Sequence, residues 1–312
     1  MKITLKIADL VFYFESDVQI SKLKEPPYQS FFSEGDAQNI YFRIRQYNLK
    51  EATLPPLTQR EINHIKKCIG FQYRWIQSPI FRVPQVRAVL ERCLIEPEST
   101  HIELAWNRAV FRNFSRNEYD LFYPLEKKPD FNDPLFLAGF RNMMSFFLPN
   151  FQALMIHGGG VIRNNLAALF LASDEGGKTS VIKSLSPREG ILSDDHLIIK
   201  RTTVGLKIHA TPFGQFTDGP REASLGGVFM LEKSSKFQII PINPIEVVHF
   251  LLKEQSHKWY TIPNRIRSRA FNILYDTCHQ APLYRMQFPK KEINWNEIDA
   301  AMAETHNIKK TE

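Results

Sequence analysis

Residues 166–185 read LAALFLASDEGGKTSVIKSL, an apolar run, a loop of small and acidic residues, and Gly-Lys-Thr before a second apolar run. A buried strand, a small-residue loop and Gly-Lys-Thr opening a helix form the layout of a Walker A loop, which binds phosphate groups. Ala172 takes its first position, and Lys178 and Thr179 take the positions of the phosphate-binding lysine and of the hydroxyl that ligates Mg²⁺. The sequence therefore predicts a phosphate-binding loop here.

Such a loop needs backbone N–H groups turned toward a polyphosphate, next to a helix N-terminus whose dipole favours anions. Small side chains let the backbone come this close, and Lys178 adds a positive charge at the β and γ phosphates. The expected nucleotide contacts are Ala172, Ser173, Asp174, Glu175, Gly176, Gly177, Lys178, Thr179 and Ser180. The alternative is an ordinary strand-to-helix turn that leaves the lysine exposed.

Two acidic residues of the loop, Asp174 and Glu175, oppose phosphate binding. A carboxylate about 6 Å from a phosphate oxygen costs about 2–3 kcal/mol per charge pair at an effective dielectric constant of about 20. We therefore expect both side chains to point away from the phosphates or to meet a metal ion. If neither happens, the loop binds nucleotide poorly.

A second acidic pair, Asp194 and Asp195, stands at a junction between two apolar runs. Adjacent side chains on extended backbone point to opposite sides, so one carboxylate can ligate Mg²⁺, directly or through water, while the other faces a reacting hydroxyl. The expected metal ligands are therefore Thr179, Asp194 and Asp195, and which acid faces the hydroxyl stays open. The alternative is an ordinary turn that contains two acids.

The pattern of hydrophobic residues changes near residue 130. Residues 3–128 contain short alternating, β-branched and aromatic runs between polar, proline-containing breaks, which predicts a strand-rich domain. In residues 134–147, apolar side chains recur at helical spacing and predict a buried helix. We expect an α+β chain with two domains, residues 1–130 and residues 131–312.

The composition excludes several classes of protein. The chain has 312 residues, of which 43% are hydrophobic and 23% charged, as in globular proteins, and this length favours two domains. The formal net charge of +7 is spread over both halves of the chain, which argues against a nucleic-acid partner. No apolar stretch approaches the length of about 18 residues that a membrane span needs, and the N-terminus lacks the features of a signal peptide.

The three cysteines, Cys68, Cys93 and Cys278, are widely separated. A sparse, odd set argues for a reducing compartment and against a disulfide framework or a structural zinc site. We therefore expect a cytoplasmic protein without a membrane partner.

Three other polar residues lie near these motifs. His196 and His209 are lone histidines on strand-like stretches, and we interpret both as structural. Arg221 lies in an expected loop, where a clamp on a phosphate or an acidic substrate is one interpretation and a solvated arginine is the favoured one.

Several segments resemble those of a known family in their order along the chain, and the interval from His157 to Ala172 is the same as in that family. They are His157-Gly158, the phosphate loop, Ser193-Asp194-Asp195, and residues 211–214, 227–232 and 281–288. Over roughly residues 134–290 the chain resembles the C-terminal kinase domain of HPr kinase/phosphorylase and its relatives, which share a phosphate-loop fold with PEP carboxykinases. The last three segments look like those of the HPr-kinase-like proteins found in many bacteria.

The resemblance implies an HPr-kinase-like phosphate-loop domain with a mixed β-sheet, which uses ATP and Mg²⁺. It implies that Lys178 binds phosphate and that Thr179 ligates Mg²⁺. Asp194 or Asp195 is then the base or the metal partner at the acceptor hydroxyl, with His157 in the catalytic neighbourhood. HPr itself is not the expected substrate, because no segment matches the N-terminal domain or the substrate-facing motif of the true HPr kinases.

The expected function is that of an ATP-dependent kinase, a transferase that phosphorylates a hydroxyl of a peptide serine or of a small metabolite. Ala172, Asp174 and Glu175 stand where the family has Gly, Ser and Gly, and they support an alternative. This is a degenerate scaffold protein of the same fold that binds nucleotide weakly or not at all. A DNA-binding regulator is disfavoured because no helix-turn-helix pattern is present. The acceptor, a reverse phosphorylase reaction and assembly into a homo-oligomer stay open.

Overall fold

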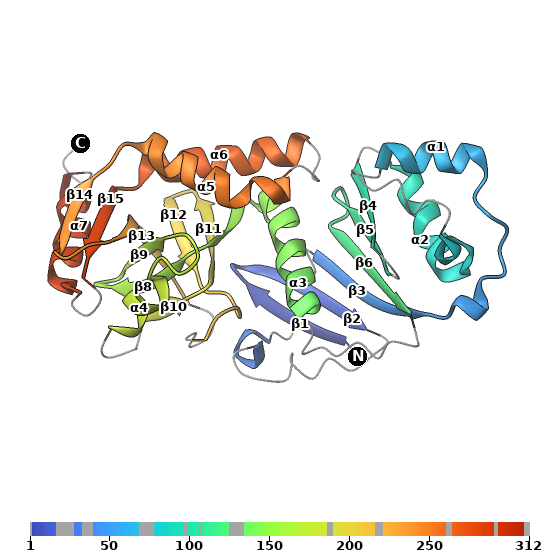
Figure 1. The fold of residues 1–312 in the computed structure, drawn as a ribbon, viewed down its shortest axis with the longest axis horizontal. Coiled ribbons are helices and arrows are strands. Elements are labelled where there is room, and N and C mark those ends of the chain that lie inside the picture. Colours follow the sequence, from blue (N-terminus) through green and yellow to red (C-terminus); the bar gives the residue numbers. More distant parts are fainter. Residues whose placement is uncertain are drawn as a thin grey trace. The chain divides into compact units, whose positions relative to one another are not determined.

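The computed structural model describes residues 2–16, 28–32, 40–68, 78–96, 99–105, 108–124, 134–185, 190–215, 221–259, 264–289 and 293–308. The chain forms two compact units, one of Met1–Phe147 with Thr261–Pro263 and one of Leu148–Tyr260 with Asn264–Glu312. Each unit contains one mixed β-sheet with helices packed on it (Figure 1). The chain therefore combines α and β structure, as the sequence predicts.

The sheet of the first unit has six strands in the order β1-β2-β3-β6-β5-β4. These strands are β1 (Lys2–Ile7), β2 (Leu10–Ser16), β3 (Ile40–Tyr47), β4 (Thr100–Ala105), β5 (Arg108–Asn113) and β6 (Glu118–Pro124). The central strand β3 is parallel to β2 and β6, and the other pairs are antiparallel. Ala8 and Asp9 join β1 to β2 with positive φ angles of 53° and 60°, as two-residue hairpin turns require.

Helices cover both faces of this sheet (Figure 1). They are α1 (Gln59–Cys68), α2 (Pro84–Ile95) and α3 (Pro134–Phe147), with short 3-10 helices at Tyr28–Phe31, Leu49–Glu51 and Pro79–Arg82. On one face, Val86 and Leu90 of α2 are buried in a cluster with Phe111 and Phe122 of the sheet. Helix α2 begins with Pro84, whose fixed φ angle suits the first position of a helix.

Helix α3 packs on the other face. The ring centroid of Phe140 lies 6.2 Å from that of Phe12, 4.8 Å from that of Phe14 and 6.3 Å from that of Phe42. Aromatic contacts of this kind stabilise a core beyond the area that they bury. The predicted helix is thus confirmed, but it belongs to the first unit, and the boundary lies after Phe147 instead of after residue 130. The polar connection expected near that boundary falls outside the described residues.

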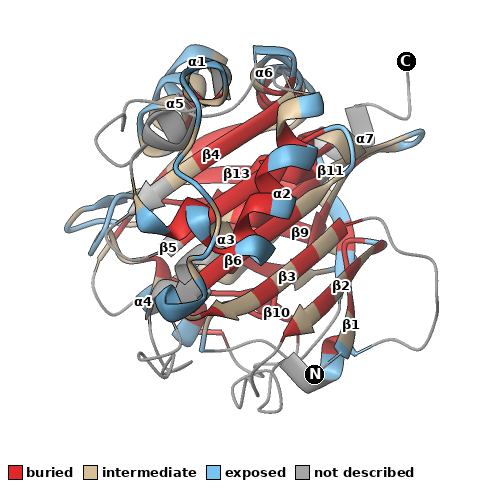
Figure 2. Ribbon diagram, turned by 90° about the vertical axis from the view of Figure 1, so that its right-hand side faces the viewer, coloured by how far each residue is buried: buried red, intermediate tan, exposed pale blue. Residues whose placement is uncertain are grey.

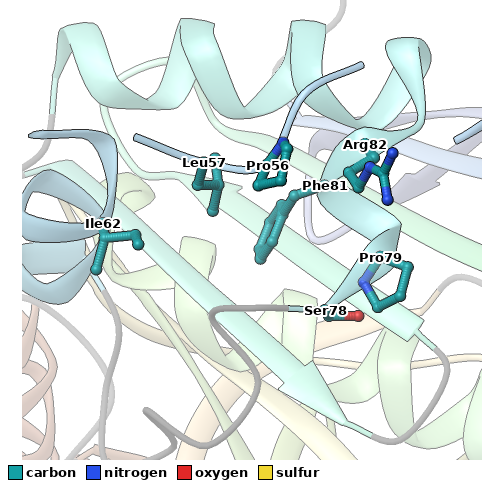
Figure 3. Close-up of a pocket in the computed structure, with 7 residues that line it drawn as sticks. All are labelled: Pro56, Leu57, Ile62, Ser78, Pro79, Phe81 and Arg82. Carbon is teal, nitrogen blue, oxygen red and sulfur yellow. The ribbon is translucent and has the colours of Figure 1, made fainter. Parts of the chain in front are cut away.

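The first unit has a pocket of about 300 Å³ beside α1 (Figure 3). Its lining residues are Pro56, Leu57, Ile62, Ser78, Pro79, Phe81 and Arg82. The exposed Arg82 is held at its edge, where Nε donates a hydrogen bond of 2.9 Å to the carbonyl oxygen of Leu54. The pocket is therefore mainly apolar, with one positive charge.

The sheet of the second unit has nine strands. They are β7 (Ala153–His157), β8 (Gly159–Arg163), β9 (Leu166–Leu171), β10 (Ile191–Ser193), β11 (His196–Thr202), β12 (Gly205–His209), β13 (Glu222–Lys233), β14 (Gln238–Pro241) and β15 (Leu283–Phe288). Their order is β10-β8-β9-β13-β12-β11-β7, and β15 pairs with β13 and β14. Strand β13 is parallel to β9 and β15, and the other pairs are antiparallel.

The connection between β8 and β9 is a tight turn of two asparagines. Asn164 and Asn165 have φ angles of 49° and 63°, and Arg163 pairs directly with Leu166. Asparagine tolerates this left-handed conformation better than most residues because its side chain hydrogen-bonds locally. The turn sets the register of the strand that leads into the phosphate loop.

The helices of the second unit are α4 (Lys178–Lys183), α5 (Pro244–Trp259), α6 (Asn264–Gln280) and α7 (Trp295–Ile308), with a 3-10 helix at Leu148–Phe151. One buried cluster joins Phe170 of β9 and Ile182 of α4 to Phe288 of β15 and Met302 of α7. The elements on both sides of the phosphate loop therefore share their core with the last strand and the last helix.

Buried residues lie mainly on the strands of both units, and exposed residues lie mainly on helices and loops (Figure 2). Cys93 and Cys278 are buried as reduced thiols. None of the helices in the described residues is long and apolar enough to cross a membrane.

Candidate functional site

The predicted phosphate loop has the expected strand, turn and helix. Strand β9 ends at Leu171, the chain turns with a hydrogen bond of 3.0 Å from the N–H of Gly176 to the carbonyl oxygen of Ser173, and α4 begins at Lys178. Gly177 has a φ angle of 102°, and a Cβ atom there would lie 2.6 Å from Cζ of Phe288. Only glycine combines this backbone conformation with so close a neighbour.

Glu175, which stands where the family that the sequence resembles has its second glycine, also has a positive φ angle, of 61°. This left-handed conformation costs of order 1–2 kcal/mol for a residue with a Cβ atom. The side chain of Asp174 is 92% exposed, and that of Glu175 is exposed as well. Both carboxylates are exposed to solvent, which weakens their repulsion of a phosphate group.

The ammonium group of Lys178 lies against the loop. Its Nζ atom donates hydrogen bonds of 2.6 Å to the carbonyl oxygen of Ala172 and 3.2 Å to that of Ser173. Burial lowers the pKa of Lys178, and the charges of Asp174, Glu254 and Asp195 oppose this shift. Lys178 is 7% exposed, so the exposed lysine expected for an ordinary strand-to-helix turn is not observed.

The register of two strands brings the second acidic pair to this loop. Strand β11 is antiparallel to β7, with His196 opposite His157, and the N–H of Gly158 donates to the carbonyl oxygen of Asp195 at 3.0 Å. The Oδ1 atom of Asp195 lies 3.5 Å from Nε2 of His157, and its Oδ2 atom lies 2.8 Å from Nδ1 of His196. Asp195 thus sits between two histidines.

Asp194 has a different environment. It is 7% exposed, and its Oδ1 atom accepts a hydrogen bond of 2.8 Å from the backbone N–H of Gln215. The two neighbouring acids therefore have separate partners, although residues 194 and 195 form a bend between β10 and β11 and not the extended backbone that the sequence predicts.

His157 stacks on His196, with ring centroids 5.2 Å apart and an angle of 17° between the planes. Burial lowers the pKa of His157 from 6.5 to about 4, with further lowering by Lys178 and His196, while Asp195 and Asp174 oppose the shift. His157 is therefore neutral at pH 7 and can donate one ring N–H and accept at the other nitrogen.

These side chains line one pocket of about 320 Å³. The lining residues are His157, Asp174, Glu175, Lys178, Thr179, Asp194, Asp195, Gly214 and Gln215. Of the other predicted contacts, Ala172, Ser173, Gly176 and Gly177 form the turn itself, and Ser180 is exposed on α4. All nine lining residues belong to the second unit, which therefore contains the whole site.

Three residues of this site have no role predicted from the sequence. His196 is expected to be structural, but its ring contacts both His157 and Asp195. Gly214 ends the segment 211–214, which is only a point of resemblance to the known family, and Gln215 follows it. By contrast, the described pocket includes neither His209, which pairs with Glu222 at 3.1 Å, nor the exposed Arg221.

The oxygen atoms of the site suit a magnesium ion. Thr179, Asp194 and Asp195 offer one hydroxyl and two carboxylates, and Mg²⁺ in nucleotide sites takes one or two carboxylates together with substrate phosphates and water. In the described part of this pocket, no three acidic or histidine side chains bring ligand atoms within 4.8 Å of one another. The donor set therefore fits a metal ion shared with a nucleotide rather than one enclosed by protein.

The low pKa of His157 predicts a loss of stability in mild acid. The unfolded chain takes up a proton near pH 6.5, whereas the folded protein resists this until about pH 4, so the stabilisation is complete above pH 6.5 and falls as the pH decreases toward 4. Urea unfolding measures the free energy of unfolding at pH 7 and at pH 5. The decrease in this free energy from pH 7 to pH 5 should be smaller by about 1–2 kcal/mol in His157→Gln than in the wild type. His279→Gln, at an exposed position of α6, is the control and should retain the wild-type difference. Equal differences in all three proteins would contradict the prediction.

Comparison with known proteins adds no assignment to this geometry. No protein-family model matches the chain, and no curated protein matches it. The chemical interpretation of the pocket therefore rests on its own residues.

Proposed function

We propose that the second unit is an ATP-dependent kinase domain of the HPr-kinase-like class that phosphorylates a hydroxyl group. The observation that carries the proposal is the meeting of three separate segments at one pocket. The phosphate loop supplies Lys178 and Thr179, the turn between β10 and β11 supplies Asp194 and Asp195, and the end of β7 supplies His157. This set contains a phosphate-binding cation, oxygen ligands for a metal ion and a base for a hydroxyl group.

In this proposal, the phosphate loop binds the nucleotide. Lys178 releases the carbonyl oxygens of Ala172 and Ser173 and contacts the β and γ phosphates, where it balances the negative charge that develops during transfer. Thr179 presents its hydroxyl at the start of α4, the position that holds Mg²⁺ in phosphate loops.

The charge balance of the pocket supports a role for a divalent cation. Among the described lining residues there are four carboxylates, those of Asp174, Glu175, Asp194 and Asp195, and one ammonium group, that of Lys178. A bound Mg²⁺ ion would supply the positive charge that offsets these carboxylates. Thr179 and Asp194 are the residues that would hold it.

Asp195 is the proposed base. Its carboxylate removes the proton of the acceptor hydroxyl as the hydroxyl oxygen forms a bond to the γ phosphorus of ATP. The bond from that phosphorus to the β–γ bridging oxygen breaks, and ADP leaves with the electron pair. Neutral His157, whose Nε2 atom lies 3.5 Å from Oδ1 of Asp195, orients the base. The acceptor is a hydroxyl of a peptide serine or of a small metabolite.

Thermal unfolding in the presence of Mg·ATP tests the proposal. A ligand at 100 times its dissociation constant stabilises the folded state by about 2.7 kcal/mol, which corresponds to a shift of several degrees in Tm for a unit of this size. We expect this shift with Mg·ATP and a much smaller one with ATP and a chelator, because the pocket alone is acidic. No shift at millimolar Mg·ATP would overturn the kinase proposal and favour the scaffold alternative.

A further inference from the structure

A segment after β12 lies against the acidic pair. It consists of residues 211–215, of which Thr211 and Phe213 are buried and Gly214 and Gln215 line the pocket. The hydroxyl of Thr211 donates 2.7 Å to the carbonyl oxygen of His196 and accepts from the N–H of Phe213 at 3.3 Å. The segment is thereby fastened to the first residue of β11.

Ser193 makes a second connection between this segment and the acids. Ser193 is fully buried, and its hydroxyl donates 2.7 Å to the carbonyl oxygen of Phe213. The hydroxyl oxygen of Ser193 also accepts hydrogen bonds from the N–H of Asp195 at 3.2 Å and from that of His196 at 3.3 Å. One hydroxyl therefore holds both the segment and the backbone that carries the acids.

The third connection reaches a carboxylate directly. The backbone N–H of Gln215 donates 2.8 Å to Oδ1 of Asp194. Gly214 makes this approach possible, because a Cβ atom there would lie 2.5 Å from that oxygen and 3.0 Å from the hydroxyl oxygen of Ser193. Its φ angle of 118° also favours glycine.

From these contacts we infer that residues 211–215 are a positioning device that fixes Asp194 as the metal-side carboxylate and leaves Asp195 to receive the proton. The inference rests on the proposed function. It assigns the metal-binding role to one acid and the role of the base to the other, an assignment that the sequence left open. Asp194 is buried with one oxygen already bonded, whereas the side chain of Asp195 is 34% exposed and faces the histidines. A carboxylate that is held rigidly suits Mg²⁺, which demands nearly ideal octahedral geometry.

Gly214→Ala tests the inference with Gly205→Ala as its matched control. Both glycines have positive φ angles, 118° and 122°, so both substitutions strain the backbone, but a Cβ atom at Gly205 meets nothing within 4 Å. Binding of Mn²⁺ in the presence of ADP would be followed by electron paramagnetic resonance, together with the Mg²⁺ dependence of phosphotransfer. We expect Gly214→Ala to raise the dissociation constant for Mn²⁺ at least about tenfold. The Mg²⁺ concentration that gives half the maximal rate of phosphotransfer should rise by the same factor. Gly205→Ala should match the wild type.

A second substitution tests the same inference if the Gly214→Ala protein does not fold. Ser193→Ala removes the hydroxyl that connects the segment to the acids and adds no atoms, so it should shift the metal dependence in the same direction. If both variants fold and keep the wild-type metal dependence, the inference is wrong while the kinase proposal stands. If the wild type itself binds neither Mn²⁺ nor nucleotide, both are overturned.

Discussion

Lys178→Met is expected to remove the Tm shift produced by Mg·ATP and to lower phosphotransfer at least about 100-fold, the scale seen when one group that stabilises developing charge is removed. The physical reason is the position of the ammonium group, which hydrogen-bonds two carbonyl oxygens of the phosphate loop and is 7% exposed. Methionine keeps most of the buried aliphatic chain, so the substitution tests the charge and not the packing.

Lys183→Met is the control for this result. Lys183 lies in the last turn of the same helix and is exposed, so its loss changes the net charge equally without changing the loop. Its Tm shift with Mg·ATP should equal that of the wild type. Should Lys178→Met bind Mg·ATP as tightly as Lys183→Met, the phosphate role of Lys178 must be abandoned. Circular dichroism would establish that both variants are folded.

Asp195→Asn is expected to lower phosphotransfer by about 10²–10⁴-fold, the usual contribution of a general base, while affinity for Mg·ATP stays within about threefold. Asparagine preserves the shape of the side chain between His157 and His196 but cannot accept the proton of the acceptor hydroxyl. Single-turnover measurements with saturating nucleotide would separate the chemical step from binding.

The neighbouring acid should respond in the opposite way. In Asp194→Asn the amide retains an oxygen that can accept the hydrogen bond of the Gln215 N–H, but one negative ligand for the metal is lost. We expect weaker Mg²⁺-dependent nucleotide binding, partly recovered at high Mg²⁺ concentration. Asp195→Asn should show no such recovery. Two acids with the same profile would mean that the roles are shared.

The local features of the fold could be predicted from the sequence because their signals are local. Two asparagines between apolar runs suffice for the turn at Asn164 and Asn165, and Gly177 before Lys178 marks the strand-to-helix turn. In both cases the turn depends on the positive φ angles of one or two residues, and the residue type alone indicates that these angles are allowed.

The unit to which α3 belongs could not be predicted in this way. The spacing of Met143, Phe140 and Phe147 shows that one face of the helix is buried, but it does not show which surface covers that face. The covering residues include Phe12 and Phe42, which are distant in sequence. The polar stretch near residue 130 therefore suggested a boundary that the packing does not follow.

The full site was also beyond sequence reasoning, because it depends on strand register. His196 comes beside His157 because β11 pairs with β7, and Gln215 comes to Asp194 only after the chain has passed through β11 and β12. The adjacent acids Asp194 and Asp195 could be identified from the sequence as candidate site residues. The role of each acid depends on contacts with residues from other segments.

The shared core of β9, α4, β15 and α7 has a consequence for the order of events during translation. Phe288 lies against Gly177, and Met302 lies in the same cluster as Phe170 and Ile182. A ribosome adds about 5–20 residues per second, so the phosphate loop leaves the exit tunnel several seconds before the strand and helix that complete its support. The pocket of the second unit therefore acquires its complete support only after Phe288 and Met302 have been synthesised.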